Sequence, residues 1–113
     1  MTIHSFDIIK EKVVRDGKVA VLVSPGFGAG WYTWNRDKEF LLFEPKVVEM
    51  VLNKVYHGEI DHYIESTYGD DFYLGGSQDL VVEWVPVGER FRVHEYDGSE
   101  SIVLESKEEW VTA

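Results

Sequence analysis

The stretch VAVLVSPGFGAGWYTWN, residues 19–35, joins a continuous apolar run to three glycines, which lead into Trp31, Tyr32 and Trp34. Its first part, VAVLVSP at residues 19–25, is rich in β-branched residues and apolar at successive positions, not only at alternate ones. That pattern is typical of a strand in the interior of a sheet. We therefore expect a buried central strand here, followed by an irregular glycine-rich exit.

The segments around this strand predict the remaining elements. Asp-Gly at residues 16–17 stands between apolar runs and predicts a hairpin, although FDIIKEKVV before it also fits a helix, so residues 5–15 stay open between helix and strand. EFLLF at residues 39–43 predicts a short strand. EPKVVEMVLNKV predicts a helix that begins at Pro45 and ends at Gly58, because its valines recur at helical spacing. EIDHYIESTY at residues 59–68 predicts a second, short helix.

The last third of the chain alternates like strands of a half-buried sheet. The expected strands are DLVVEWVPVG, RFRVHEY and SIVLES, and Asp97-Gly98 supplies a tight turn between the last two. Trp110 and Val111 are expected to pack back onto the sheet. The sum predicts a single α+β domain over residues 1–113, with a mostly antiparallel sheet of five to six strands and one or two helices on one face.

Composition excludes several classes of protein. With 113 residues, 44% of them hydrophobic and 28% charged, the chain has the composition of one ordinary globular domain. It contains no cysteine, which excludes disulfides, cysteine-based zinc sites and thiol nucleophiles. No secretory signal or membrane-spanning run is recognisable. We expect a soluble protein of a reducing cytoplasm with no membrane association.

The net charge of −10 is unevenly distributed. Residues 1–58 contain 8 Lys and Arg against 7 Asp and Glu, whereas residues 59–113 contain 3 against 14. An acidic half repels phosphate backbones, so direct binding of nucleic acid is not expected. The acidic side chains either keep a small protein soluble or attract a basic protein surface.

The glycine–aromatic loop is the best candidate site. Its glycines form G-x-G-x-G, which is neither the dinucleotide fingerprint nor a phosphate loop, and no helix follows to offer its N-terminus. Two readings remain open. Either the glycines admit a flat ligand or a partner on which the rings stack, or they only permit a bend while the rings fill the core. Three bulky rings within four residues cannot all point inward, so at least one is expected on the surface. The candidate binding residues are Gly26, Phe27, Gly28, Gly30, Trp31, Tyr32, Trp34, Asn35 and Arg36.

A second glycine-bounded segment, TYGDDFYLGG, could form a facing wall with Asp70, Asp71 and Tyr73. Adjacent acids in an extended chain point to opposite sides, so a metal site is not expected there. His57 and His62 are five residues apart, which does not match the four-residue spacing of a helical zinc motif. No cofactor and no metal ligand are predicted.

The loop, the helix after FEP, the segment YLGGSQDLVVEWVPVGERFRV and the turn EYDGSESI together resemble a family of small hypothetical proteins. These are encoded by bacterial viruses, plasmids and some bacterial chromosomes. The resemblance covers nearly the whole chain and implies no catalytic residue. It implies a mobile-element accessory protein that works in the bacterial cytoplasm, a setting in which small proteins often inhibit a host defence.

Three hypotheses for function follow. The first is a non-enzymatic binding protein that uses residues 24–36, with a small planar nucleotide-like molecule or a bacterial protein as its partner. The second is an acidic inhibitor or interaction module that acts through the C-terminal half. The third is a small enzyme with acid and base groups assembled across the fold from Asp70, Asp71 or His94. A homodimer that buries part of the loop would weaken the first hypothesis.

Overall fold

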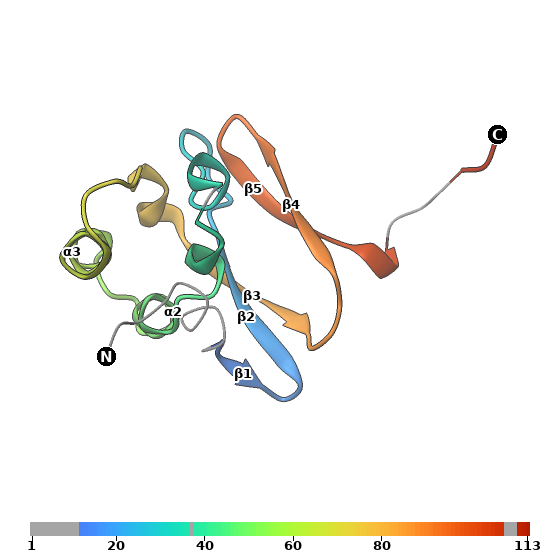
Figure 1. Cartoon of the computed structure of the whole chain (residues 1–113), viewed down its shortest axis with the longest axis horizontal. Coiled ribbons are helices and arrows are strands. Elements are labelled where there is room, and N and C mark those ends of the chain that lie inside the picture. Colours follow the sequence, from blue (N-terminus) through green and yellow to red (C-terminus); the bar gives the residue numbers. More distant parts are fainter. Residues whose placement is uncertain (1–11, 37, 108–110) are drawn as a thin grey trace.

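Strand β2 (Lys18–Val23) lies at the centre of the fold, as its apolar run predicts (Figure 1). In this computed structural model, which describes residues 12–36, 38–107 and 111–113, β2 pairs with β1 (Val14–Arg15) on one side. On its other side it pairs with β3 (Val81–Pro86), and both pairings are antiparallel. The predicted central strand is confirmed.

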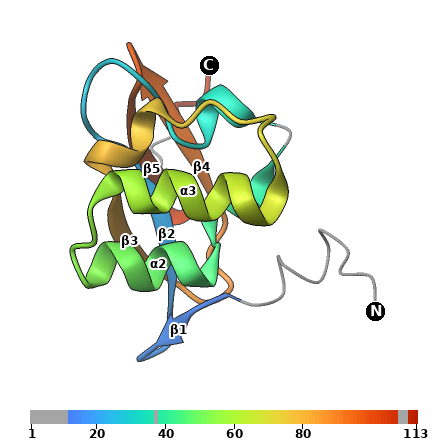
Figure 2. The same ribbon diagram turned by 90° about the vertical axis from the view of Figure 1, so that its left-hand side faces the viewer.

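Both faces of β2 are buried, each by a different layer. Ala20 and Leu22 face a core that is covered by helices α2 (Pro45–Leu52) and α3 (His57–Tyr68). The two helices run side by side over the same face of the sheet (Figure 2). Val21 and Val23 face a second core beneath the hairpin of β4 (Phe91–Tyr96) and β5 (Ser99–Leu104). The layers are therefore helices, sheet and hairpin.

The α+β class and the antiparallel pairing are confirmed, but the expectation of one sheet with five to six strands is wrong. The described strands form a three-stranded sheet, β1-β2-β3, and a separate pair, β4-β5. The chain leaves the first sheet after Pro86, which lacks a backbone N–H, and turns through Gly88 at φ +86°. The hairpin then packs Phe91 and Ile102 onto the open face of the sheet and does not extend its edge.

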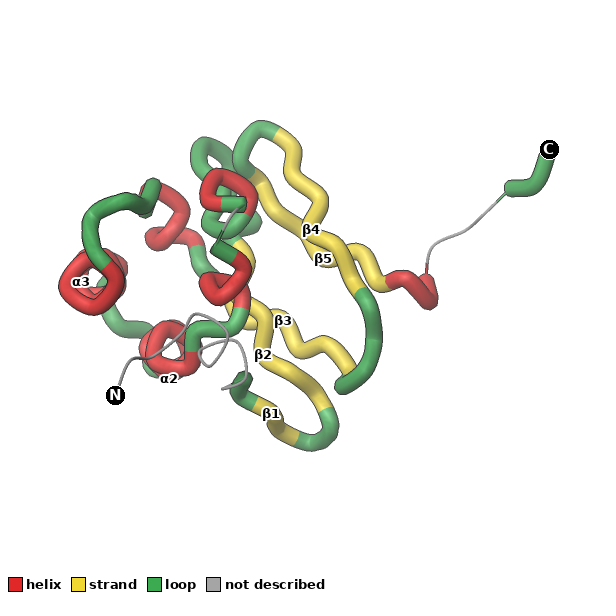
Figure 3. Tube along the Cα trace, viewed as in Figure 1, coloured by secondary structure: helices red, strands yellow, loops and turns green. Residues whose placement is uncertain are grey.

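Two short turns carry the hairpins, as Asp-Gly predicts. Asp16 and Gly17 have φ values of 52° and 75°, and Asp97 and Gly98 have values of 51° and 84°. Two successive positive φ angles define a type I′ turn, whose twist matches that of paired strands. Four short 3-10 helices complete the described structure (Figure 3): η1 (Thr33–Asn35), η2 (Glu39–Leu42), η3 (Gly75–Asp79) and η4 (Glu105–Lys107).

Helix α2 begins at Pro45, as predicted, and the side chain of Glu44 caps it by accepting from the Lys46 N–H at 2.7 Å. The prediction that it ends at Gly58 is wrong. It ends at Leu52, because Lys54 turns into the left-handed region at φ 57°. Gly58 lies inside α3, which is the predicted second helix with two more residues at its start.

The expected strand at residues 39–43 is a 3-10 helix, η2, in the structure. A five-residue apolar run does not distinguish a buried strand from a buried turn of helix. Here the turn distributes its side chains between the two cores. Phe40 and Leu41 point to the helix-side core, whereas Leu42 and Phe43 point to the hairpin-side core.

Predictions were also made for the two ends of the chain. Of residues 5–15, for which helix and strand were both open, residues 14–15 are strand and residues 5–11 lie outside the described residues, as does Trp110. Val111 is 97% exposed, so the prediction that it packs back onto the sheet is wrong. Along the described part of the chain, no helix is long and apolar enough to cross a membrane.

Candidate functional site

The glycine-rich loop is fixed at both ends by one buried carboxylate, that of Glu100. Glu100 lies in β5 and is 1% exposed. One of its oxygens accepts from the Ser24 N–H at 2.9 Å, and the other accepts from the N–H and the hydroxyl of Thr33, both at 2.7 Å. A buried charge is tolerated only when it is fully hydrogen-bonded. Residues 24–33 are thus folded around Glu100.

Several glycines allow the loop to lie directly against its neighbours. A Cβ on Gly98, in the β4–β5 turn, would lie 2.5 Å from the backbone nitrogen of Ala29. A Cβ on Gly76 would lie 2.8 Å from the backbone nitrogen of Trp31, and one on Gly30 would overlap the side chains of Thr33 and Trp34. Each contact is too close for any real Cβ atom. These glycines therefore pack the chain against itself.

The remaining two glycines of the predicted site differ in their surroundings. A Cβ on Gly26 would overlap the carboxylate of Asp79, whereas Gly28 has φ +118° and open space around it. The Gly28 N–H donates to the Asp97 carbonyl at 3.0 Å, which holds the tip of the loop beside the hairpin turn. Phe27 stands at this tip and is 71% exposed.

The three rings after the glycines point in different directions, as the crowding argument predicts. Trp31 is fully buried, and its indole N–H donates to the Leu41 carbonyl at 2.8 Å. Tyr32 is half-buried and contacts both cores. Trp34 is 43% exposed. Trp31 is therefore a core residue, and Trp34 carries the aromatic surface of the segment.

Trp34 meets the second predicted wall, which follows α3. The ring centroids of Trp34 and Tyr73 lie 4.9 Å apart at 54°, and Tyr73 is 52% exposed. The buried amide of Asn35 joins the two segments by donating to the carbonyls of Trp31 and Tyr73, at 2.8 and 2.9 Å, and by accepting from the Tyr73 N–H at 2.9 Å. Asn35 thus positions the aromatic pair.

A cleft of about 410 Å³ opens beside this pair. Its lining residues are Trp34, Asn35, Arg36, Lys38, Asp70, Asp71, Phe72 and Tyr73. The structure thus brings together the last part of the glycine–aromatic loop and all three predicted residues of the second wall. The other predicted residues, 26–32, do not line this cleft.

The cleft places cations opposite carboxylates. The Lys38 ammonium lies 3.8 Å from the Asp71 carboxylate and 5.2 Å from the centroid of the Phe72 ring. Asp71 is almost fully exposed, so this ion pair is weak and can be opened by a ligand. Arg36 is exposed and adds a second positive charge. The cleft can therefore hold a ring by stacking and an anion by charge.

A second buried carboxylate supports the wall of the cleft from behind. Glu44 is 1% exposed and accepts from the hydroxyls of Tyr63, at 2.5 Å, and Tyr68, at 2.7 Å. Burial and the hydrogen bond to Glu44 raise the pKa of Tyr63 to about 12, and the same causes raise the pKa of Tyr68 well above its usual range. The Tyr68 ring packs on Phe40 with centroids 4.6 Å apart, and Phe40 meets Phe72 edge-on at 6.0 Å.

Several residues of this arrangement are not among the predicted site residues, including Lys38, Phe72, Glu100 and Glu44. Lys38 and Phe72 are sequence neighbours of predicted residues, so only their side-chain directions were missing. Glu100 was not predicted as a site residue. A signal for its burial existed, because Glu100 is two residues before Ile102 and so shares the inward face of β5. Glu44 precedes Pro45, a position typical of a helix N-cap.

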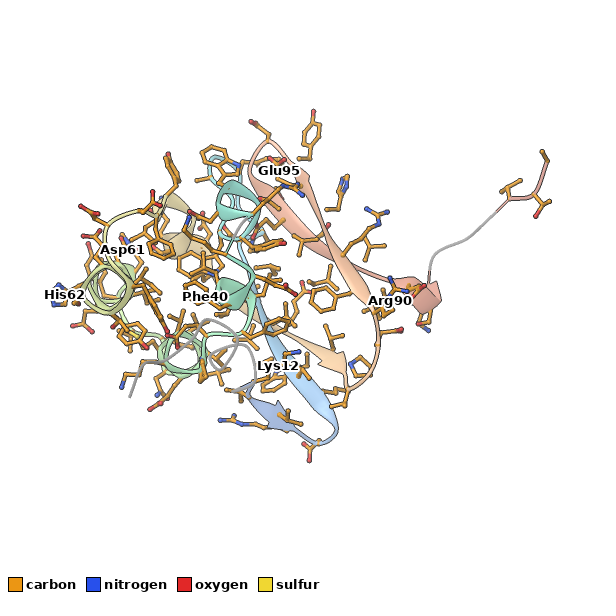
Figure 4. All side chains as sticks on the ribbon, viewed as in Figure 1. Lys12, Phe40, Asp61, His62, Arg90 and Glu95 are labelled. Carbon is orange, nitrogen blue, oxygen red and sulfur yellow. The ribbon has the colours of Figure 1, made fainter. Side chains whose placement is uncertain are left out.

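The described histidines lie apart from one another and from the acids of the cleft. Across the described ranges, no group of three or more His, Asp and Glu side chains could hold a metal ion. The His62 side chain points outward from α3, away from the rest of the protein (Figure 4). His57 packs against the Tyr56 ring at 4.5 Å. His94 is exposed on β4, and it does not line the cleft that contains Asp70 and Asp71.

The fold and the site together define a three-layer α+β domain with an aromatic, charge-lined cleft between residues 34–36 and residues 70–73. A scan against protein-family models finds no match, and searches of curated proteins and of solved structures find none either. The resemblance to small proteins of mobile elements therefore stays a prediction, and the function must be argued from the cleft.

Proposed function

We propose that the chain is a non-enzymatic binding protein whose cleft takes a small planar anionic molecule of the nucleotide class. The observation that carries the proposal is the exposed pair of Trp34 and Tyr73 beside two cationic side chains. Large exposed rings cost solvation free energy unless a partner covers them. With the resemblance to accessory proteins of mobile elements, the proposed role is sequestration of a signal molecule.

The residues of the cleft suit the parts of a nucleotide. A base would stack on Trp34 or Tyr73, since any aromatic face accepts any base. The phosphates would lie toward Arg36 and Lys38, and would replace Asp71 as the partner of Lys38. Asp70 and Asp71 are placed to accept from ribose hydroxyls or an exocyclic amine. The volume, about 410 Å³, lies in the usual range for small-molecule sites.

A thermal-shift panel of mono-, di- and triphosphate nucleosides and cyclic dinucleotides tests the proposal. We expect at least one class to raise the melting temperature of the wild type, because a ligand that binds only the folded state stabilises it. Trp34→Ala should weaken binding about 10- to 100-fold, since base stacking contributes roughly 1–3 kcal/mol.

Tyr96→Ala is the matched control, because Tyr96 is another strongly exposed ring that does not line the cleft. It should bind like the wild type. If no member of the panel shifts the wild type, the small-molecule proposal fails.

A second candidate function rests on the charge of residues 55–89. This segment contains 8 Asp and Glu and no Lys or Arg. Its exposed acids on α3 and in the loop after it, Glu59, Glu65, Asp70 and Asp71, would meet a basic protein surface. Pull-down from a bacterial lysate tests this. Capture that does not weaken between about 0.05 and 0.3 M salt would contradict charge-led binding.

A further inference from the structure

A second hollow lies on the opposite side of the η1–η2 segment from the cleft. Its volume is about 400 Å³, and it runs between this segment and strand β4. Its lining residues are Lys12, Tyr32, Arg36, Glu39, Leu42, Phe43, Glu89, Arg90, Phe91, Arg92 and Val93. We call this hollow the β4 groove. Arg36 is the one lining residue that it shares with the cleft.

The charge of the β4 groove is opposite to that of the chain. Four of its lining residues are basic and two are acidic, whereas the chain carries a net charge of −10. The Lys12 ammonium lies 4.4 Å from the centroid of the Phe43 ring, over the apolar floor. The Arg90 side chain is 85% exposed, with only a surface pairing to Glu105 at 3.6 Å. Of the two acids, Glu89 already accepts from the Ser106 hydroxyl.

The backbone of β4 also takes part in the groove. Phe91, Arg92 and Val93 all line it, although successive side chains of a strand point to opposite faces. A hollow that touches three consecutive residues runs along the edge of the strand. Among the described strands, β4 pairs only with β5, so this edge is open to a further strand.

We propose that the β4 groove binds an extended acidic segment of a partner protein, which adds as a strand to β4. Backbone hydrogen bonds to the open edge would supply affinity, and alternate side chains would supply specificity. Acidic side chains of the segment would meet Lys12, Arg36 and Arg90, which Figure 4 shows in part, with Lys12 and Arg90 labelled. The intervening apolar side chains would contact the half-buried Tyr32, Phe91 and Val93.

The proposal is tested by fluorescence anisotropy with a labelled heptapeptide of alternating Glu and Val. A peptide with Lys in place of every Glu is the charge control, and one with N-methylated backbone at every second residue is the strand control. We expect the acidic peptide to bind, salt to weaken it, and both control peptides to bind at least tenfold more weakly.

Two charge reversals locate the binding. Arg90→Glu should weaken the acidic peptide at least tenfold and improve the Lys peptide. Lys46→Glu makes the same change in charge on exposed α2, outside the groove, and should change the affinity less than threefold. Trp34→Ala should leave peptide binding unchanged, which separates this proposal from the nucleotide cleft.

Three results would overturn the proposal. They are no binding of the acidic peptide up to about 1 mM, equal binding by wild type and Arg90→Glu, and equal binding of the N-methylated peptide. A fourth result would also overturn it, by identifying a different occupant. If light scattering shows a dimer that Arg90→Glu converts to a monomer, the groove holds a second copy of this chain and not an acidic partner.

Discussion

The two halves of the glycine–aromatic segment differ in what surrounds them. Residues 24–31 are wrapped around Glu100, crossed closely by Gly76 and Gly98, and end in the fully buried Trp31. Residues 34–36 present Trp34 and Arg36 to solvent beside Tyr73. The comparison teaches that the chain up to Trp31 mainly builds the fold, whereas Trp34 and Arg36 form surface. The first half, held by its contacts with Glu100, Gly76 and Gly98, can therefore position a recognition surface on the second half.

The largest expected difference in stability between the two halves is the one between substitutions of Trp31 and of Trp34. Trp31→Ala should lower the free energy of unfolding by about 4 kcal/mol, because it empties a core site and removes the hydrogen bond to Leu41. Trp34→Ala should lower it by less than about 1 kcal/mol, since the ring is nearly half exposed. Denaturation in urea measures both, and equal losses would contradict the division into two halves.

The next largest difference in stability is expected between alanine substitutions of two glycines that occupy the same position of the same turn type. Gly17 and Gly98 both have positive φ, but a Cβ on Gly17 meets open space whereas one on Gly98 meets the loop backbone. Gly17→Ala should cost about 1 kcal/mol of stability, from backbone strain alone. Gly98→Ala should cost about 3 kcal/mol, because the loop must also move away. A smaller loss for Gly98→Ala than for Gly17→Ala would show that the loop does not rest on this turn.

Glu100→Gln should cost about 2 kcal/mol. The amide keeps one acceptor oxygen, so it leaves at least one buried donor of Ser24 or Thr33 without a partner. Glu105→Gln is the control, because Glu105 is exposed and should change stability by less than about 0.5 kcal/mol. Chemical denaturation at neutral pH compares the two variants. A Glu100→Gln variant as stable as Glu105→Gln would contradict the role of Glu100 as the centre of the loop.

A smaller effect on the free energy of unfolding is expected at high pH, from Tyr63 in the wall behind the cleft. The pKa of Tyr63 is raised to about 12 in the folded protein, whereas the unfolded chain ionises near 10. The stabilisation is present below pH 10 and falls as pH rises toward 12, because only the unfolded chain releases its proton in that window. Tyr63→Phe should reduce the slope of unfolding free energy against pH between 10 and 12. An unchanged slope would show that burial and the hydrogen bond to Glu44 do not raise the pKa of Tyr63.

Elements that are determined by short-range sequence patterns could be predicted, whereas features that depend on packing between distant segments could not. The apolar run of β2, the Asp-Gly turns and the periodicity of α2 are local signals, and each element was predicted. The separation of β4 and β5 into their own sheet depends on which face the hairpin covers, and no short-range pattern encodes that. The same holds for residues 39–43, whose apolar side chains are divided between two cores.

The candidate site shows the same limit. Residues 34–36 and the wall at residues 70–73 were both selected for their composition, and the structure brings them together through Asn35. Composition alone does not indicate the burial of Trp31 and Glu100, because it depends on contacts between segments about 10 to 76 residues apart. For Glu100 the only local signal is its spacing of two residues from Ile102 in β5. An acidic residue in a turn-rich stretch is ordinarily solvated.

The most direct test of the account follows the indole N–H signals of the tryptophans by NMR during titration with the strongest nucleotide of the panel. Trp34→Phe assigns the Trp34 signal. The account predicts that the Trp34 signal shifts with ligand concentration, while the signal of buried Trp31 stays in place. A Trp34 signal that does not move while the nucleotide binds would contradict the claim that the exposed half of the segment is the binding surface.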